Sequence, residues 1–429
     1  MSTSFGTLDL SNVELVGRDN ELSILHDIYN QVRKASFTVG EGEELKEEAP
    51  TPPTDSSTAT TTTTATNSTS RCRAVFVGGY SGAGKTSLVR TFVKTIKQEQ
   101  RKHGDNEQSQ VLFGDGKYDL LARLRPFSGL VDAMDNLCSQ IENPTKELGD
   151  QLKEQLGTND VELLTTLVPS VNRLLVGGSG AGSGATVENR GGGSRPSPSS
   201  MVAPSGGGGR RRSSTSLLVD ENSIARMKLA FQTLLRVIVN HANPKKDSTT
   251  VILHLDDLQW GDSATLEVIQ FLLENSDGLT SSVMIIGCYR DNEVDDEHVL
   301  SFKLNELKQN TSESFQLIEI GELSKDNLRD MICGILHMDK DDDEENNNPN
   351  NLRTLSDTIH RKTNGNPFFT LQFLDLLEKK KLLVFNVMRC KWEWDTEEIK
   401  SEMDVTSNVV EMVATKILWL QHDTQRVLK

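Results

Sequence analysis

The sequence is poor in several features that mark particular classes of protein. Only 5% of its 429 residues are aromatic, so it offers few rings on which single-stranded nucleic acid could stack. Acidic side chains outnumber basic ones, and a formal net charge of −16 disfavours sequence-independent binding to nucleic acid or to an anionic membrane. We therefore expect neither nucleic acid nor a membrane among its partners.

Cysteine is scarce, and long apolar runs are missing. No run reaches the length of a membrane span, and residues 1–6 lack a basic region followed by an apolar stretch. The five cysteines show no C-x-x-C pair and no zinc-like spacing, which suits free buried thiols in a reducing compartment: Cys72, Cys138, Cys288, Cys333 and Cys390. These absences predict a cytoplasmic protein.

Three low-complexity stretches contain too few apolar side chains to pack into a core. Residues 51–70 are dominated by Thr, Ser and Pro, residues 177–216 by Gly and Ser, and residues 339–351 are acidic and then Asn-rich. We predict that all three are disordered insertions. A run of arginines before Ser213 and Ser214 could make these serines a kinase target, although basic tracts are common in disordered segments.

The sequence does contain a complete phosphate-binding pattern, G-x-x-x-x-G-K-[ST]. It follows an apolar run at 74–77 and precedes an amphipathic helix, which favours a phosphate loop over a chance glycine-rich turn. Lys85 would reach the β- and γ-phosphates, and the Thr86 hydroxyl would bind Mg²⁺. The residues predicted to hold ATP or ADP here are Gly79, Tyr80, Ser81, Gly82, Ala83, Gly84, Lys85, Thr86 and Ser87.

A second apolar run, at 250–255, ends in two carboxylates. Such a run is typical of a central parallel strand, whose carboxyl end faces the ligand in α/β folds. We predict that Asp256 binds Mg²⁺ and that Asp257 is the general base, while a solvated loop is the alternative. His254 in the same run is expected to be a packed core histidine, because no second His or Cys keeps metal-ligand spacing with it.

The ordered parts alternate strand and helix, which predicts an α/β fold with a parallel sheet covered on both faces. A helical lid should follow from residue 323, with Ser324 as an N-cap. A hairpin should come next, in which one of the two tryptophans, Trp392 and Trp394, is buried and the other is more exposed. The expected strands are 74–77, 111–113, 251–255, 283–288 and 316–320. The expected helices are 21–32, one after the phosphate loop, 127–141, 224–240, 264–274, 298–308, 352–362 and 367–380.

These elements divide the chain into five parts. We expect an N-terminal segment at 1–36, an acidic and Thr-rich insertion at 37–70, the ATPase core at 71–322, the helical lid at 323–380, and a hairpin with a truncated helical segment at 381–429.

Five motifs occur in an order that resembles a known family: LVGRDNEL at 15–22, the phosphate loop, LDDLQWGD at 255–262, YRDNEV at 289–294 and TNGNPFF at 363–369. Together they look like the origin-recognition-like AAA ATPase domain of signal-transduction ATPases with numerous domains (STAND), as found in large multidomain sensor kinases. The resemblance covers nearly all of the sequence expected to be ordered. It implies a P-loop NTPase core with a helical lid, and ATP and Mg²⁺ as ligands.

The resemblance also assigns roles to single residues. Val16, Gly17 and Arg18 would line the adenine and ribose side of the pocket, although a plain turn before a helix is the alternative. Arg290 would sense the γ-phosphate and join Lys85 and Asp257 as a catalytic residue, unless it pairs with a carboxylate. Pro367 would approach the adenine, yet it also suits an ordinary helix start after an Asn cap. Asp262 matches a family carboxylate and equally suits an N-cap.

Two departures from the family stand out. The long insertion separates Arg18 from the phosphate loop, and the chain stops inside an expected helix where family members continue into further modules. We expect either a fragment or a stand-alone switch that works on a protein partner, with slow ATP hydrolysis and a possible nucleotide-dependent oligomer. The alternatives are a nucleotide-stabilised scaffold without turnover, a DNA-binding initiator ATPase, and a small-molecule phosphotransferase.

Overall fold

The computed structural model describes residues 7–10, 13–37, 72–103, 109–120, 125–141, 144–176, 221–242, 248–276, 282–311, 313–338 and 351–404. The stretches at 51–70 and 177–216 lie outside the described residues. So do residues 339–350 and the helix expected near the end of the chain.

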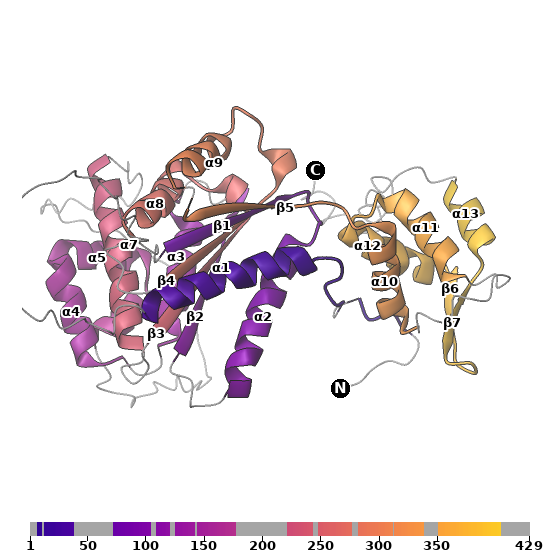
Figure 1. Ribbon diagram of the computed structural model, residues 1–429, viewed down its shortest axis with the longest axis horizontal. Coiled ribbons are helices and arrows are strands. Elements are labelled where there is room, and N and C mark those ends of the chain that lie inside the picture. The colour runs from indigo at the N-terminus through magenta and orange to yellow at the C-terminus, as the bar shows by residue number, and fades with distance from the viewer. Residues whose placement is uncertain are drawn as a thin grey trace, which may run out of the picture.

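A five-stranded sheet forms the centre of the larger part of the molecule (Figure 1). Its order is β2-β3-β4-β1-β5, and every neighbouring pair is parallel. All five predicted strands are confirmed, with longer bounds: β1 Cys72–Gly79, β2 Ser109–Lys117, β3 Ser248–Asp256, β4 Ser282–Tyr289 and β5 Phe315–Ile320.

Both faces of the sheet are buried, as the continuous apolar runs predict. Along β1, Val75 and Val77 point to the face covered by α1 (Asp19–Phe37) and α2 (Lys85–His103). Ala74 and Phe76 point to the opposite core. That core is closed by α3 (Ser128–Ser139), α7 (Glu221–Ala242), α8 (Ser263–Glu274) and α9 (Val299–Asn310).

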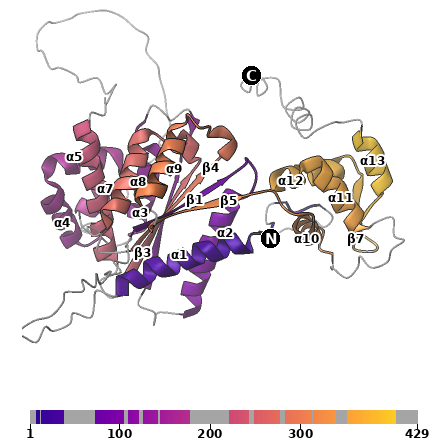
Figure 2. The same cartoon turned by 45° about the horizontal axis from the view of Figure 1, so that its top comes forward.

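Four α-helices of the described residues were not predicted. One of them, α13 (Thr396–Asp404), lies in the C-terminal part. The other three are α4 (Lys146–Leu156), α5 (Thr158–Leu167) and α6 (Val171–Val176). Leu148, Leu152, Leu164 and Leu174 bury these helices against the α3–α7 side of the core. Figure 2 shows α4 and α5 at the end of the molecule farthest from the C-terminal helices of residues 325–404. These helices therefore enlarge the core without approaching the phosphate loop.

The C-terminal part has an apolar core of its own, built from α10 (Lys325–Leu336), α11 (Leu352–Thr363), α12 (Pro367–Lys379), β6 (Leu383–Asn386), β7 (Lys391–Trp394) and α13 (Thr396–Asp404). Ser324 caps α10 as predicted, accepting a hydrogen bond from the backbone N–H of Asn327. The expectation for the tryptophans was wrong: Trp392 and Trp394 are both buried, because residues two apart on a strand share one face.

Candidate nucleotide site

The phosphate loop joins the carboxyl end of β1 to the first turn of α2. Gly82 adopts φ +81°, and a Cβ added there would lie 2.7 Å from Phe368 Cβ. Only glycine meets both demands without strain, since a side chain would oppose the backbone conformation and the close approach of α12. The loop residues therefore lie where the sequence pattern places them, between a central strand and a helix N-terminus.

Lys85 is buried at the start of α2. Its Nζ donates hydrogen bonds to the carbonyl oxygens of Gly79 at 2.6 Å and Tyr80 at 2.8 Å, which bends the side chain back over the loop. Burial is the largest influence on the ammonium and lowers the pKa of Lys85, while the charges of nearby acidic groups oppose that shift. A desolvated cation held over a glycine-rich loop is well placed for a phosphate group.

Thr86 and Asp256 lie side by side. The Thr86 hydroxyl donates to Asp256 Oδ2 at 3.1 Å, and Asp256 Oδ1 accepts from the backbone N–H of Asp257 at 3.1 Å. A hydroxyl and a carboxylate oxygen at this spacing suit Mg²⁺, which binds oxygen ligands and keeps several of its waters. The residues therefore fit the ion that the fold implies.

Asp257 has different surroundings from its neighbour. Its Oδ1 accepts from Arg290 Nε and from Gln259 Nε2, each at 3.1 Å, and its Oδ2 lies 3.1 Å from Lys117 Nζ. Burial raises the pKa of this carboxyl, but the hydrogen bonds from Gln259 and Lys117 and the nearby cations outweigh burial, so the pKa lies below its ordinary value. Asp257 is therefore a stabilised carboxylate and a weak base.

Arg290 lies beside Asp257 rather than alone. Besides Asp257 it contacts Glu293 Oε1 at 2.7 Å, and its guanidinium lies 4.8 Å from the centre of the Trp260 ring. The pairing with a carboxylate, left open from the sequence, is therefore present. The positive charge of Arg290 also helps to lower the pKa of Lys85, so the two cations are near enough to repel one another.

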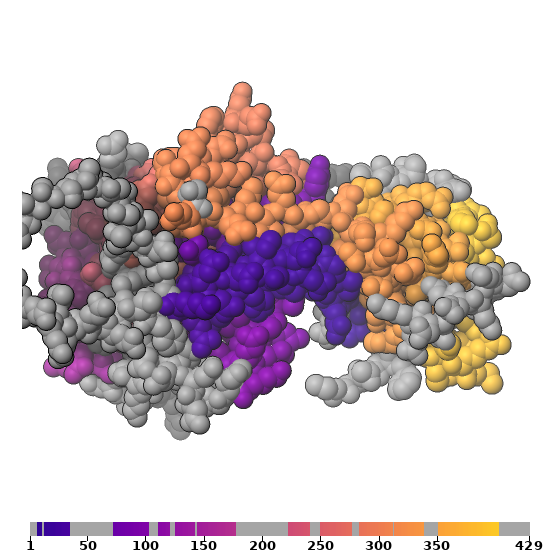
Figure 3. Space-filling view, viewed as in Figure 1, coloured from indigo at the N-terminus to yellow at the C-terminus, as the bar shows by residue number. Residues whose placement is uncertain are grey.

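The N-terminal segment docks against the loop, although residues 38–71 separate the two in the sequence. Arg18 is buried, and its Nη2 donates to the carbonyl oxygens of Ala83, at 3.2 Å, and of Gly321, between β5 and α10. Val16 packs against the C-terminal core, and a Cβ added at Gly17 would lie 2.2 Å from the Asn327 amide. Figure 3 shows α1 running across the face of the core toward the C-terminal part.

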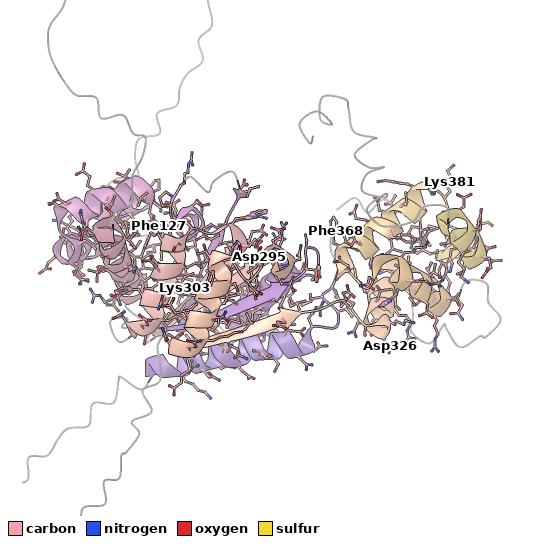
Figure 4. The ribbon with its side chains drawn as sticks, turned by 90° about the horizontal axis from the view of Figure 1, so that it is seen from above. Phe127, Asp295, Lys303, Asp326, Phe368 and Lys381 are labelled. Atoms are coloured by element: carbon pink, nitrogen blue, oxygen red, sulfur yellow. The ribbon has the colours of Figure 1, made fainter. Side chains whose placement is uncertain are left out.

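Helix α12 also contacts the loop. Asn366 caps α12 and donates through its amide to the Ser81 carbonyl at 3.0 Å, and the backbone N–H of Phe368 donates to the Gly82 carbonyl at 3.3 Å. Pro367 is at the first helical position, which confirms the ordinary helix start. Figure 4 shows Phe368 on the side of the C-terminal part that faces the core.

Asp262 caps α8, as the alternative interpretation proposed. Its Oδ1 accepts from the backbone N–H of Thr265 at 2.9 Å, and its Oδ2 from that of Phe127 at 2.9 Å. The carboxylate therefore ties the start of α8 to the start of α3.

A cavity of 1020 Å³ opens beside Thr86 and Asp256 and extends along α2. Phe113 and Phe368 contribute apolar walls, and the cationic residues that line it are Arg90, Lys94, Lys97, Arg101 and Lys117. We call the four of these on α2 the basic face. They recur every three or four residues, so they share one side of the helix. The chain therefore has a local basic surface although its net charge is strongly negative.

Sequence reasoning missed Lys117, Gln259 and Asp115 as neighbours of the site. Lys117 ends β2 directly opposite Asp256, and Asp115 pairs in register with His254. Lys117 and Asp115 could have been predicted as neighbours of the site, because they lie near the carboxyl end of a strand. Parallel strands that end at the same sheet edge bring such side chains together. His254 itself is buried, as expected.

A sequence profile of the AAA ATPase domain matches residues 62–286, slightly more than half of the 429 residues. The chain belongs to the AAA ATPase domain family. The parallel sheet, the phosphate loop after β1 and the flanking helices have the P-loop NTPase fold of the AAA+ class. Membership of the family implies nucleotide binding.

One curated relative is hybrid signal transduction histidine kinase G of Dictyostelium discoideum, which is 24% identical over 419 residues. The match covers 82% of this chain and 10% of the kinase, so the chain spans about a tenth of the length of that relative. The helices that the structure describes include none long and apolar enough to span a membrane.

Two solved structures show lower identity. The ORC2 protein of Aeropyrum pernix is 13% identical, with a TM-score of 0.42, over 87% of this chain and 66% of its own. A STAND protein of Pyrococcus horikoshii with a tetratricopeptide repeat sensor is 11% identical, with a TM-score of 0.27, over 70% of this chain and 28% of its own. The expectation that this chain has no nucleic-acid partner stays a prediction.

Proposed function

We propose that this AAA ATPase domain is an ATP-dependent switch of the STAND type with slow hydrolysis. ATP would bind at Gly79–Ser87 with Lys85 on its β- and γ-phosphates. Thr86 and Asp256 would hold Mg²⁺, which neutralises phosphate charge when it is bound. The adenine would lie toward Val16, Gly17, Arg18 and Pro367. On this side of the site, the N-terminal segment and α12 both contact the phosphate loop.

One observation carries the proposal of a switch. Three successive carbonyl oxygens of the phosphate loop, on Ser81, Gly82 and Ala83, accept hydrogen bonds from Asn366, Phe368 and Arg18. A loop that changes shape between ATP and ADP would change these bonds directly. This joint would thus supply contacts that differ between the ATP and ADP states, which a ligand needs in order to shift a conformational equilibrium.

The catalytic roles follow from the carboxylate pair. Asp257 would orient the attacking water and accept its proton, and Arg290 would leave Asp257 for the γ-phosphate. The low pKa of Asp257 makes it a weak base, which is consistent with slow turnover. A scaffold that binds ATP without turnover is the second candidate, because both oxygens of Asp257 are already paired.

The test combines nucleotide analysis of the purified protein with hydrogen exchange of the α12 N-terminus. We expect ATP or ADP to co-purify, ATP to release phosphate slowly, and the Phe368 amide to exchange at different rates in the ATP and ADP states. Equal exchange in both states would contradict the switch. Nucleotide binding without phosphate release would favour the scaffold.

An initiator-type function would require binding to duplex DNA, for which the basic face offers a surface. We expect no mobility shift with duplex DNA at physiological salt. A shift that Arg101→Gln weakens would support the initiator alternative.

A further inference from the structure

Three potential metal ligands converge beneath the phosphate loop. One ring nitrogen of His254, one carboxylate oxygen of Asp256 and the Cys288 sulfur all lie within 4.8 Å of one another. His254 and Asp256 are two residues apart on β3 and so share a face. The β3–β4 register pairs His254 with Ile286, which places Cys288 on that same face of the neighbouring strand.

His254 has one ring nitrogen without a partner. It is 3% exposed, and Nδ1 lies 2.6 Å from Asp115 Oδ1 on β2, while Nε2 is buried and contacts no hydrogen-bonding group of the described residues. A buried polar atom left unpaired costs free energy that a ligand would return. A carboxylate on the far nitrogen is also the usual partner of a metal-bound histidine, because it fixes the tautomer and orients the ring.

We propose that His254, Asp256 and Cys288 bind a transition-metal ion of the zinc type, and that this ion excludes Mg²⁺-nucleotide because both need Asp256. A set of imidazole nitrogen, carboxylate oxygen and thiolate sulfur selects Zn²⁺ or a similar borderline ion. Mg²⁺ takes oxygen ligands and would leave the Cys288 thiol unused. The same strand ends would therefore serve two ions of different chemistry.

The geometry requires only small adjustments. Ligand bonds of about 2.0–2.3 Å in a tetrahedron place the donor atoms about 3.3–3.8 Å apart, against the present limit of 4.8 Å. Side-chain rotations would close that difference, and Cys288 would lose its thiol proton to water as the metal bond formed. The cavity along α2 reaches both His254 and Asp256, which gives an ion access to an otherwise buried cluster.

The test uses Co²⁺ as a coloured substitute for zinc, added to the full chain without nucleotide. Binding at the proposed site should give one equivalent of tightly bound Co²⁺ and a near-ultraviolet charge-transfer band that only a thiolate ligand produces. Cys288→Ser should remove the band, while Cys138→Ser and Cys390→Ser should retain it. A wild-type protein without the band, or a band that survives Cys288→Ser, would overturn the proposal.

Two further variants test the metal site independently, in case the Cys288→Ser protein does not fold. His254→Gln removes the nitrogen ligand and should weaken Co²⁺ binding at least about tenfold, with a shifted spectrum. Asp115→Asn removes only the orienting partner, so it should weaken binding about ten- to a hundredfold while the charge-transfer band remains. Unchanged affinity in both variants would contradict the assignment.

A competition experiment tests the link to the nucleotide site. Mg²⁺-ATP should displace Co²⁺ and abolish the band, and Zn²⁺ should weaken ATP binding to the wild type but not to Cys288→Ser. If the band forms but ATP leaves it unchanged, the shared use of Asp256 is wrong. The band is measured without nucleotide, so it tests the metal site even if the proposed switch function fails.

Discussion

Asp256 and Asp257 are neighbours in the sequence, but the two sides of the site that they belong to are built differently. Asp256 faces Thr86, and this side consists of the phosphate loop, the start of α2 and the end of β3. Asp257 faces Lys117 and Arg290, which come from the ends of β2 and β4. The backbone of Asp257 is left-handed, at φ +55°, which turns the two side chains apart.

The two sides are formed by different kinds of contact. The Asp256 side, which we propose binds the nucleotide phosphates and so call the binding side, is built around one contiguous motif, to which β3 adds Asp256. The Asp257 side, which we propose for turnover, depends on ion pairs between strand ends that are far apart in the sequence. We therefore expect substitutions on the two sides to separate nucleotide affinity from hydrolysis.

The largest expected effect is that of Lys85→Ala on the binding side. The variant removes a buried cation that would meet phosphate charge in both the ground state and the transition state, so ATP affinity should fall by at least about a hundredfold. Titration with a fluorescent nucleotide measures the loss. Lys102→Ala, an exposed lysine on the same helix that does not line the cavity, is the control and should bind normally. Tight ATP binding by Lys85→Ala would mean that the loop is not the phosphate site.

The Asp257→Asn variant should separate ATP hydrolysis from ATP binding. It keeps the size and most of the hydrogen bonding but loses the basic oxygen, so ATP should still bind while phosphate release falls on the order of 10²-fold. Asp295→Asn makes the same chemical change at an exposed position and should release phosphate at the wild-type rate. A wild-type rate in Asp257→Asn would show that Asp257 is held by its ion pairs for structure alone.

Lys117→Met should shift the pH dependence of hydrolysis. The pKa of Asp257 is lowered in the folded protein, so activity that needs its carboxylate is present at neutral pH and is lost as pH falls through that pKa. Without Lys117 the pKa rises toward its ordinary value of about 3.9, which moves the acid limb of the rate profile to higher pH. Lys102→Met, at an exposed position outside the cavity, should leave the pH profile unchanged. If Lys117→Met also leaves the profile unchanged, protonation of Asp257 does not limit the rate.

Asn366→Ala should give a smaller effect, on the joint between the loop and α12. It loses a helix cap, worth about 1 kcal/mol of stability, and the bond to Ser81. Asn351→Ala loses the cap of α11 in the same way, through Arg353 and Thr354. Both variants should melt earlier by a similar amount, but only Asn366→Ala should change ATP affinity. Equal nucleotide affinities would show that the loop contact is passive.

The smallest effect is expected from replacing residues 51–70 with a short Gly/Ser linker. Helix α1 docks through Leu25, Ile28 and Val32 on the sheet and through Arg18 on the loop, so its position does not depend on the connecting sequence. ATP affinity should stay within about twofold of the wild type by nucleotide titration. A large loss would mean that the insertion contributes to the site.

The sequence predicted the strands and the loop well because their signals are local. Buried parallel strands read as apolar runs, and the phosphate loop is one contiguous pattern. Ser324, Asn366 and Asp262 were readable as caps for the same reason. The helices α4–α6 were missed because they are short and are stabilised by tertiary burial of a few leucines, which periodicity in a single segment does not reveal.

The site residues show the same difference between local signals, which a sequence reveals, and contacts that depend on the fold. Thr86 and Asp256 were expected as partners and lie 3.1 Å apart. The ion pairs of Asp257 with Lys117 and Arg290 depend on strand order, and a single sequence does not give the order of its strands. Arg18 was expected near the adenine, and its bond to Ala83 places it on the loop backbone. Its role toward the nucleotide stays a prediction.

The bonds to the outer side of the phosphate loop have a mechanical consequence. A trans peptide is a rigid plate with its carbonyl on one edge and the next N–H on the opposite edge. The Ser81 carbonyl bonded to Asn366 is therefore one plate with the Gly82 N–H, and the Ala83 carbonyl bonded to Arg18 is one plate with the Gly84 N–H. Any rotation that turns these N–H groups toward a phosphate must tilt the opposite edges by the same angle. A rotation of these peptide units on phosphate binding would therefore be passed to α12 and to the N-terminal segment through the backbone of the loop alone.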